Sequence, residues 1–283
     1  MANVDREVRD TFIPDPGQVF LEPDASQAEH RVVAVLSGDP EMTEKARLLP
    51  DEYDQHAVSA SIIFGIPESE VTYDQRQLGK KTVHGVERGM MGETLADNLL
   101  KDGYVHTPDE CQRWIDIILR REKGIQRYFD WIVREVLNYG RLTNSWNRCW
   151  DVKHEQLNAA LYRRAYSWTP QSEVSDLVIQ WGIKPLREYI RTQYPGRARL
   201  CCTVYDSILI SCEPEIAYDL AAFVTPLLQQ TRTYHGAAGD VELSMPVEFK
   251  VGTTWKGEKE WKKLPSREEM NETIKTLTTP GKQ

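Results

Sequence analysis

The expected fold follows from one stretch of sequence, Gly17-Gln18-Val19-Phe20-Leu21-Glu22-Pro23-Asp24-Ala25-Ser26-Gln27-Ala28-Glu29. Its first seven residues are a mainly apolar run bounded by turn residues, which predicts a short strand. Ser26 to Glu29 have the spacing of a capping box, in which a serine and a glutamate three residues later satisfy the first amides of a helix. The stretch therefore predicts a strand that ends at Asp24 and passes directly into a helix.

A second aspartate occupies a similar place later in the chain. Residues 199–211 are typical of two short apolar strands with Tyr205-Asp206-Ser207 between them, and a closing strand is expected near Val247–Val251. The expected fold class is therefore α+β, with a sheet interrupted by a helical insertion. Asp24 and Asp206 would then lie on neighbouring strands of one sheet.

Further helices are expected between and after these strands. They are expected at 54–64, from Thr72 or Asp74 to about Met90, at 108–138, at 153–194 with an interruption near Thr169-Pro170, and at 214–229. The polar tail from Lys256 is expected to be helical or loose.

Two aspartates at strand ends have two interpretations. Carboxylates brought together repel each other unless a proton or a metal neutralises them, and a pair of divalent cations is a common solution in polymerases, nucleases and phosphatases. Aspartates are also frequent in turns. On the pair alone, the turn interpretation is the better one.

The composition describes an acidic chain with a basic middle. The chain has 283 residues and a net charge of −8, which argues against a strongly basic nucleic-acid binder. Three segments of the chain differ in charge, however: residues 1–72 carry −10, residues 73–199 carry +5 and residues 200–283 carry −3. No apolar stretch is long enough to span a membrane, the N-terminus does not resemble a signal peptide, and five cysteines without metal-ligand spacing indicate a cytoplasmic protein that is not secreted.

A row of cations repeats every four residues in the middle segment. Its members share one face of the expected helix and are Arg76, Lys80, His84 and Arg88, with His56 able to join them from the preceding helix. A row of this length matches a triphosphate, although an exposed basic face is the commoner meaning. The interpretation as an exposed basic face is weakened by three glycines in the same segment, Gly79, Gly85 and Gly89. Glycines favour the close approach of a base pair or of another helix.

In this order, these features resemble the polymerase domain of family A DNA polymerases, the DNA polymerase I family. The segment 24–31 resembles the motif D-Y-S-Q-I-E-L-R, and Asp54-Gln55-His56 resembles D-I-H. Residues 76–89 resemble the motif R-x-x-x-K-x-x-N-F-G-x-x-Y-G. The run from Arg163 to Gln171 resembles R-x-x-x-N-x-x-x-Q, and 204–207 resemble V-H-D-E.

The resemblance implies a fold and a reaction. The fold would be a right-hand palm, with an antiparallel sheet at 1–53 and 151–283, interrupted by helical fingers at 54–150. The reaction would be template-directed addition of dNTPs to a primer 3′-hydroxyl. Two Mg²⁺ ions would be held by Asp24, Asp206 and the backbone carbonyl of Ala25.

Roles for the other residues follow from the same resemblance. The dNTP would contact residues of the motifs at 24–31, 54–56 and 76–89, namely Gln27, Glu29, His56, Arg76, Lys80 and His84. Glu29 would exclude a ribose 2′-hydroxyl, and Lys80 would act as general acid toward pyrophosphate. Primer–template DNA would contact Arg88, Arg163, Ser167, Gln171 and Tyr205.

The chain also departs from the family pattern. Ser207 stands where the family has Glu, Tyr205 where it has His, His84 where it has Phe, Arg88 where it has Tyr, and Ser167 where it has Asn. The second aspartate thus lacks the third carboxylate beside it. These departures favour a divergent branch of the family, with phage polymerases as the candidate.

In the family, the thumb, the first palm segment and any 3′–5′ exonuclease precede the first motif, which here begins at Asp24. We therefore expect half of a split polymerase, with a second polypeptide that supplies the thumb, the first palm segment and any exonuclease. Two alternatives remain: a non-catalytic DNA-binding or assembly subunit that retains the fold, and a metal-dependent nuclease, which the basic row disfavours.

Overall fold

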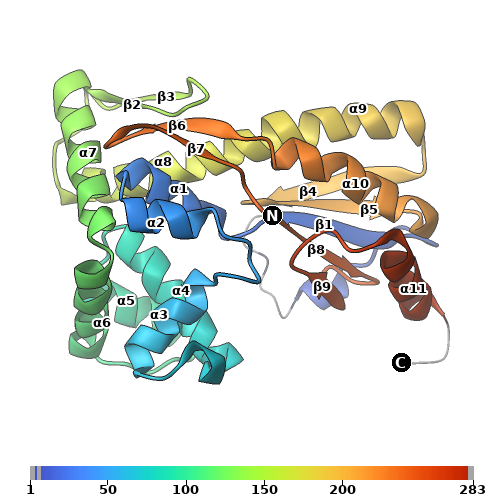
Figure 1. The fold of residues 1–283 in the computed structure, drawn as a ribbon, viewed down its shortest axis with the longest axis horizontal. Coiled ribbons are helices and arrows are strands. Elements are labelled where there is room, and N and C mark those ends of the chain that lie inside the picture. Colours follow the sequence, from blue (N-terminus) through green and yellow to red (C-terminus); the bar gives the residue numbers. More distant parts are fainter. Residues whose placement is uncertain (1–3, 5–7, 280–283) are drawn as a thin grey trace. The chain divides into compact units, whose positions relative to one another are not determined.

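The strand that ends near Asp24 is the central strand of a five-stranded antiparallel sheet. In the computed structural model, which describes Val4 and residues 8–279, the strand order is β4-β5-β1-β8-β9. The strands are β1 (Val19–Ala25), β4 (Ala198–Val204), β5 (Ser207–Cys212), β8 (Val247–Gly252) and β9 (Lys259–Trp261). Figure 1 shows β1, β4, β5 and β8 side by side. The expected α+β fold class is confirmed.

The chain divides into two compact units. The sheet unit contains Met1–Ala28, Val174–Thr231 and Ser244–Gln283, and the helical unit contains Glu29–Glu173 and Arg232–Leu243. These borders do not coincide with the palm and fingers borders at 53/54 and 150/151, so that division stays a prediction.

Helices cover one face of the sheet. Helix α10 (Ala217–Leu228) contacts β1 and β8, α9 (Lys184–Gln193) contacts β4, and the π-helix η3 (Val178–Ile183) contacts β5. Because side chains alternate between faces along a strand, Val19 and Leu21 of β1 lie on one face and Phe20 and Glu22 on the other. The remaining elements of the unit are the short helices η1 (Arg9–Thr11) and η4 (Pro214–Ile216) and the helix α11 (Arg267–Thr278).

The opposite face carries a smaller apolar cluster. Phe20, Val204, Leu209 and Trp255 are all buried in it. The ring of Phe12 meets that of Trp255 edge to face at 5.5 Å, and the Trp255 amide donates to the Phe12 carbonyl. The segment before β1 therefore covers one end of this face.

The helical unit consists mainly of α-helices. They are α1 (Ala28–Ser37), α2 (Pro40–Ala46), α3 (Gln55–Phe64), α4 (Tyr73–Glu87), α5 (Gly92–Lys101), α6 (Pro108–Arg121), α7 (Lys123–Tyr139) and α8 (Ala159–Leu177), with a short helix η2 (Glu68–Glu70). Two hairpins complete the unit, one of β2 (Arg141–Thr143) and β3 (Cys149–Asp151) and one of β6 (Arg232–Gly236) and β7 (Gly239–Leu243). Helix α8 starts in this unit and ends in the sheet unit.

Side-chain caps explain several helix boundaries. Asp54 accepts hydrogen bonds from the amides of His56 and Ala57 at the start of α3, and Thr72 forms a capping box with Gln75 at the start of α4. The helix expected at 108–138 is instead two helices, α6 and α7. They are separated at Glu122, whose backbone is not helical.

Pro170 does not interrupt its helix, contrary to expectation. A proline inside a helix leaves the carbonyl four residues earlier without a donor, and here that carbonyl belongs to Tyr166. The buried hydroxyl of Tyr128, on α7, donates to it at 2.8 Å. The helix therefore continues through Pro170, and the irregular stretch lies further along, in the π-helix η3.

Two other expectations concern the whole chain. None of the described helices is both long and apolar enough to cross a membrane. All five cysteines are free thiols.

Replacing Tyr128 with Phe should lower the free energy of unfolding by about 1–3 kcal/mol, because the buried carbonyl of Tyr166 loses its donor. Urea unfolding followed by circular dichroism measures the loss, with Tyr139→Phe at the exposed end of α7 as the matched control. In a Pro170→Ala background the restored backbone amide can donate instead, so the loss should shrink. Equal losses in both backgrounds would contradict this account of Pro170.

Candidate functional site

Asp24 and Asp206 lie at the same end of adjacent strands. Asp24 of β1 is opposite Ser207, the first residue of β5. Asp206 directly precedes Ser207 and lies in the two-residue turn that joins β4 to β5. The amide of Ala25 donates to the backbone carbonyl of Asp206 at 3.0 Å, and both aspartates are half-buried. Their expected placement on neighbouring strands is confirmed.

The turn that carries Asp206 is conformationally strained. Tyr205 has a φ of 55°, in the left-handed region that non-glycine residues rarely adopt, and its side chain is exposed. A residue held there costs on the order of 1–3 kcal/mol, and such residues concentrate at functional sites. The strain is a consequence of turning the chain in two residues while keeping Val204 paired with Ser207.

The surroundings of Asp24 are strongly charged. Glu248 of β8 lies opposite Asp24, and burial, followed by the charge of Asp24, raises the pKa of Glu248. Burial alone would lower the pKa of Lys250, but the charges of Asp24, Glu22 and nearby glutamates outweigh it and raise that pKa. This part of the sheet is therefore a region of negative potential.

The donor set at this edge fits a hard divalent cation. Carboxylate and carbonyl oxygens are the ligands that Mg²⁺ prefers, usually one or two carboxylates with water and substrate phosphates completing the shell. Two half-buried aspartates in a negative potential meet that requirement. Among the described residues, no group of three or more His, Cys, Asp or Glu side chains is arranged to hold a metal by itself.

Helices α3 and α4 carry the residues expected to bind a triphosphate. His56 is in the first turn of α3, and Arg76 of α4 reaches across to the cap of that helix, with its Nε 2.7 Å from Oδ2 of Asp54. Lys80 is exposed one turn further along α4. Arg76, Lys80 and His56 are thus supported by one pair of packed helices.

The imidazole of His56 is buried. Its two ring nitrogens have no hydrogen-bond partner among the described residues, and its ring centre is 5.4 Å from that of His84. Burial and the positive charges of His84, Lys80 and Arg76 hold the pKa of His56 well below its ordinary value. At neutral pH the ring is therefore neutral, with one N–H left to donate.

The glycines in and just after α4 have different surroundings. A Cβ on Gly79 would lie 2.4 Å from the backbone oxygen of His56, so α3 and α4 can approach this closely only with glycine there. Gly85 faces Met90 and Leu95, and Gly89, which has a positive φ, faces the ring of Tyr166. Of the two explanations offered by the sequence, close packing against another helix explains Gly79, while Gly85 meets only side-chain atoms and Gly89 is favoured by its positive φ.

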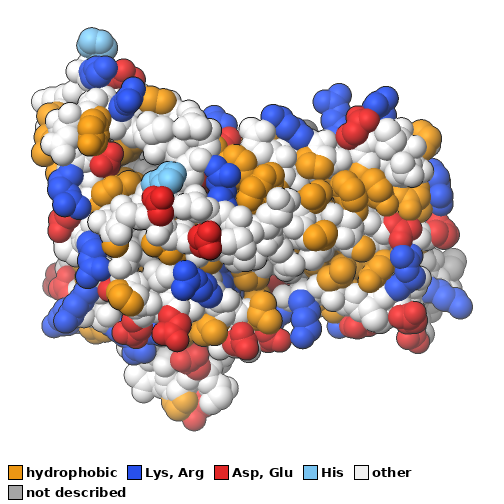
Figure 2. Space-filling model, turned by 45° about the horizontal axis from the view of Figure 1, so that its top comes forward, with side chains coloured by type: hydrophobic (Ala, Val, Ile, Leu, Met, Phe, Trp, Pro, Cys, Tyr) orange, Lys and Arg blue, Asp and Glu red, His pale blue; other side chains and the backbone are white. Residues whose placement is uncertain are grey.

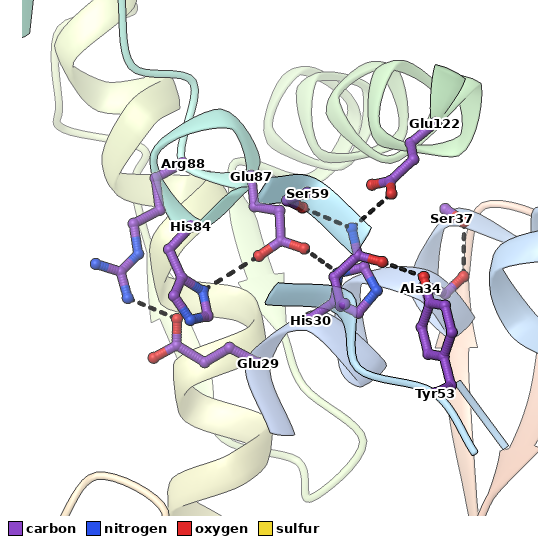
Figure 3. A network of polar contacts seen from close by, with 11 residues as sticks. Glu29, His30, Ala34, Ser37, Tyr53, Ser59, His84, Glu87, Arg88 and Glu122 are labelled. Atoms are coloured by element: carbon purple, nitrogen blue, oxygen red, sulfur yellow. Dashed lines mark hydrogen bonds and ion pairs between the residues drawn. The ribbon is translucent and has the colours of Figure 1, made fainter. Parts of the chain in front are cut away.

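Glu29 is paired with a cation rather than being only a candidate helix cap. Its Oε2 lies 2.6 Å from Nη2 of Arg88, and both side chains are partly buried. Figure 3 shows the two side chains pointing toward each other, Glu29 from α1 and Arg88 from the end of α4. Arg88 therefore fixes the direction of the carboxylate expected to face the sugar.

A buried ion pair missed by the sequence analysis lies beside this one. Glu87 of α4 stands between two imidazoles, 2.5 Å from Nδ1 of His30 and 3.4 Å from Nδ1 of His84 (Figure 3). Burial opposes ionisation of both partners. The mutual charge and hydrogen bond of His30 and Glu87 outweigh it, so the pKa of His30 is raised and that of Glu87 is lowered. No local pattern signals this pair, because the two residues are 57 positions apart.

Further buried polar contacts lie near the start of α7. The amide nitrogen of Gln55 lies 2.6 Å from Oε1 of Glu122 and 3.2 Å from the hydroxyl of Ser59, and its amide oxygen accepts from Tyr53. Burial raises the pKa of Glu122. The break between α6 and α7 thus places a carboxyl group in the interior next to an amide donor.

Three of the five residues expected to contact primer–template share one face of α8. Arg163, Ser167 and Gln171 follow each other at four-residue spacing and are exposed or half-buried. Gln27 lies between β1 and α1 with a φ of 51°. On the face of the molecule that Figure 2 shows, Lys and Arg side chains are interspersed with Asp and Glu rather than separated from them.

Comparison with known proteins decides the family. The family model described as DNA polymerase family A matches residues 2–257. The chain belongs to DNA polymerase family A. Its sequence is 28% identical over 254 residues to DNA polymerase I of Chloroflexus aurantiacus, and the match covers 88% of this chain and 25% of the relative. It is 25% identical over 244 residues to the DNA polymerase of Bacillus phage SP01, covering 82% and 26%.

A solved structure has a similar fold. It is the POL domain of Pol1 from M. smegmatis in complex with DNA primer-template and dNTP, with a TM-score of 0.70 at 22% identity, covering 89% of this chain and 42% of that one. This family A chain thus spans about a quarter of the length of the two relatives above and less than half of the solved domain.

The His30–Glu87 pair predicts a pH-dependent stability. Replacing Glu87 with Gln should lower the free energy of unfolding by about 3–5 kcal/mol where both groups are charged, because it breaks a buried pair. The folded pKa of His30 lies above its ordinary value of 6.5, so this contribution is complete below 6.5 and is lost as pH rises through the folded pKa. The folded pKa of Glu87 lies below 4.5, so the contribution is also lost as pH falls through that value.

Urea unfolding of wild type and E87Q at about pH 5.5 and about pH 9 measures the change. The difference between the two proteins should be larger at the lower pH. E188Q, which breaks an exposed pair with Arg191, is the control and should change little at either pH. A difference for E87Q that stays constant with pH would show that the ion pair is not formed.

Proposed function

We propose that this family A chain carries the catalytic centre of a DNA-directed DNA polymerase, which adds dNTPs to a primer 3′-hydroxyl in a template-directed reaction. The observation that carries the proposal is the placement of Asp24 opposite Ser207 and next to Asp206, at one end of adjacent strands. Family membership and the described DNA and dNTP complex of the solved relative support the substrates.

The cofactor in this proposal is a pair of Mg²⁺ ions. Asp24, Asp206 and the backbone carbonyl of Ala25 would hold them, because these oxygens are the donors that Mg²⁺ prefers. Bound divalent cations lower the pKa of the attacking hydroxyl and stabilise the charge that develops around the α-phosphate.

The helical unit supplies most of the groups that would bind the nucleotide. His56, Arg76, Lys80 and His84 would bind the triphosphate, with Arg76 oriented by Asp54 and His56 donating its single N–H. Lys80, the exposed member of this set, would protonate the leaving pyrophosphate. Gln27 and Glu29 would contact the rest of the dNTP, with Glu29 against C2′ of the sugar.

The DNA would be bound by residues on α4, α8 and the β4–β5 turn. They are Arg88, Arg163, Ser167, Gln171 and Tyr205. Long polar side chains at four-residue spacing can follow a backbone or read the minor groove of a duplex. Activity would also require the rest of the polymerase domain, including the thumb, from a second polypeptide or from further residues of a longer chain.

Replacing Asp24 or Asp206 with Asn should reduce primer extension by at least about 100-fold, because metal-held charge at the reacting phosphate is worth several kcal/mol. The assay uses a labelled primer–template, dNTPs and Mg²⁺, with this chain supplemented by the polypeptide that completes the domain. Asp97→Asn, at an exposed position of α5, is the control, and this variant should extend the primer normally. Unchanged extension by D24N would rule out the proposed reaction, while unchanged DNA binding is expected.

Replacing Glu29 with Ala should raise ribonucleotide incorporation, because the carboxylate that excludes the 2′-hydroxyl is gone. We expect the ratio of kcat/KM for dNTP over rNTP to fall at least about tenfold, which corresponds to about 1.4 kcal/mol. Arg88→Ala should lower the same ratio, since it releases the carboxylate that the 2.6 Å ion pair directs.

Single-nucleotide kinetics with matched dNTP and rNTP measure both variants. Arg113→Ala, at an exposed position of α6, serves as the control for loss of an arginine. If E29A and R88A both discriminate as wild type does, Glu29 serves only to hold the helical unit together.

A further inference from the structure

Glu22 is a buried carboxylate close to the aspartate pair. It lies two residues before Asp24 in β1, so both side chains project from the same face of the sheet. Only 4% of Glu22 is exposed, and it stands opposite Lys250 of β8 in the strand register. None of the roles proposed above uses it.

Ser207 joins Glu22 to the turn that carries Asp206. The Ser207 hydroxyl lies 2.7 Å from Oε1 of Glu22 and 3.2 Å from the carbonyl oxygen of Val204. A hydroxyl has one proton, so it donates to one of these oxygens at a time, and the shorter distance favours the charged carboxylate. The serine itself is buried, opposite Asp24 and adjacent to Asp206.

A buried carboxylate at this position has a cost that packing does not explain. Burying an ionised carboxylate costs several kcal/mol, even after the surrounding protein relaxes. Phe20, two residues earlier on the same face, packs in the apolar cluster with Leu209, so an apolar side chain could also be accommodated on this face. The negative charge and the bond to Ser207 are what distinguish Glu22 from such a residue.

We propose that Glu22 is a positioning residue for the Asp24–Asp206 pair. Through Ser207 it fixes the β4–β5 turn and with it Asp206, and its charge increases the attraction of the pair for a divalent cation. The chain has Ser207 where related motifs have Glu, and Glu22 returns a carboxylate to the same place from the neighbouring strand. The proposal rests on the proposed function.

Manganese affinity of the full chain tests this without relying on activity. Titration with Mn²⁺, with the free ion followed by electron paramagnetic resonance, should show E22Q binding about 10- to 100-fold more weakly than wild type, the usual loss when an outer-shell partner is removed. S207A, which keeps the carboxylate but removes its tie to the turn, should also bind more weakly. E268Q, on the exposed first turn of α11, is the control and should bind as wild type does.

The variant D24N distinguishes failure of this proposal from failure of the proposed function. Loss of Mn²⁺ binding in D24N together with wild-type affinity in E22Q and S207A would overturn this proposal and leave the proposed function standing. Wild-type affinity in D24N would overturn both. Thermal unfolding of each variant is recorded alongside, and a lowered Tm with unchanged Mn²⁺ affinity would assign Glu22 a structural role only.

Should E22Q not fold, S207A decides alone, because it removes only the hydroxyl. The double variant E22S/S207E then adds an independent check by exchanging the two side chains between the strands. It should bind Mn²⁺ at least about tenfold more tightly than S207A, if the carboxylate acts by its place in the sheet. Affinity no better than that of S207A would count against the proposal.

Discussion

The antiparallel pairing of β1 with β5 is the interaction on which this chain depends most. Because side chains alternate along a strand, a slip of one residue would carry Asp24 and Glu22 to the face that packs against helices. The observed register instead sets Asp24 opposite Ser207 and Leu21 opposite Ile210. The same pairing thus builds the core on one face and gathers the carboxylates on the other.

Both units keep charged groups inside the protein, and both do so by supplying close partners. In the sheet unit, buried Glu22 receives a hydrogen bond from Ser207. In the helical unit, Glu87 stands between two imidazoles. Removing one partner from such an arrangement leaves an uncompensated buried charge, which is why each arrangement constrains neighbouring elements strongly. Here the constrained elements are the β4–β5 turn and the junction of α1 with α4.

Much of this fold could be predicted from local sequence patterns. The strands around Asp24 and Asp206 and the helix after Thr72 were predicted because alternation, apolar periodicity and capping are local signals. The continuation of α8 through Pro170 was not predictable, because it depends on a hydroxyl that Tyr128 supplies from another helix. The roles assigned to the site residues remain predictions that follow from resemblance.

Contacts between distant residues account for the rest of what the sequence could not reveal. Glu22 appears in the sequence as one polar residue in an apolar strand, and only the register brings it to Ser207, 185 positions away. The pairing of Arg88 with Glu29 likewise requires α1 and α4 to be packed together. Such pairs have no signature in a single sequence, because each partner taken alone has an ordinary local explanation.

We propose that Asp24 and Asp206 together hold a divalent cation. Crystals of this chain soaked in Mn²⁺ and measured at the manganese absorption edge would test it most directly. We predict an anomalous peak within coordinating distance of both carboxylates, at the end of β1 beside the β4–β5 turn. A well-ordered site without manganese there, or manganese bound only to other acidic residues, would show that Asp24 and Asp206 do not hold a divalent cation together.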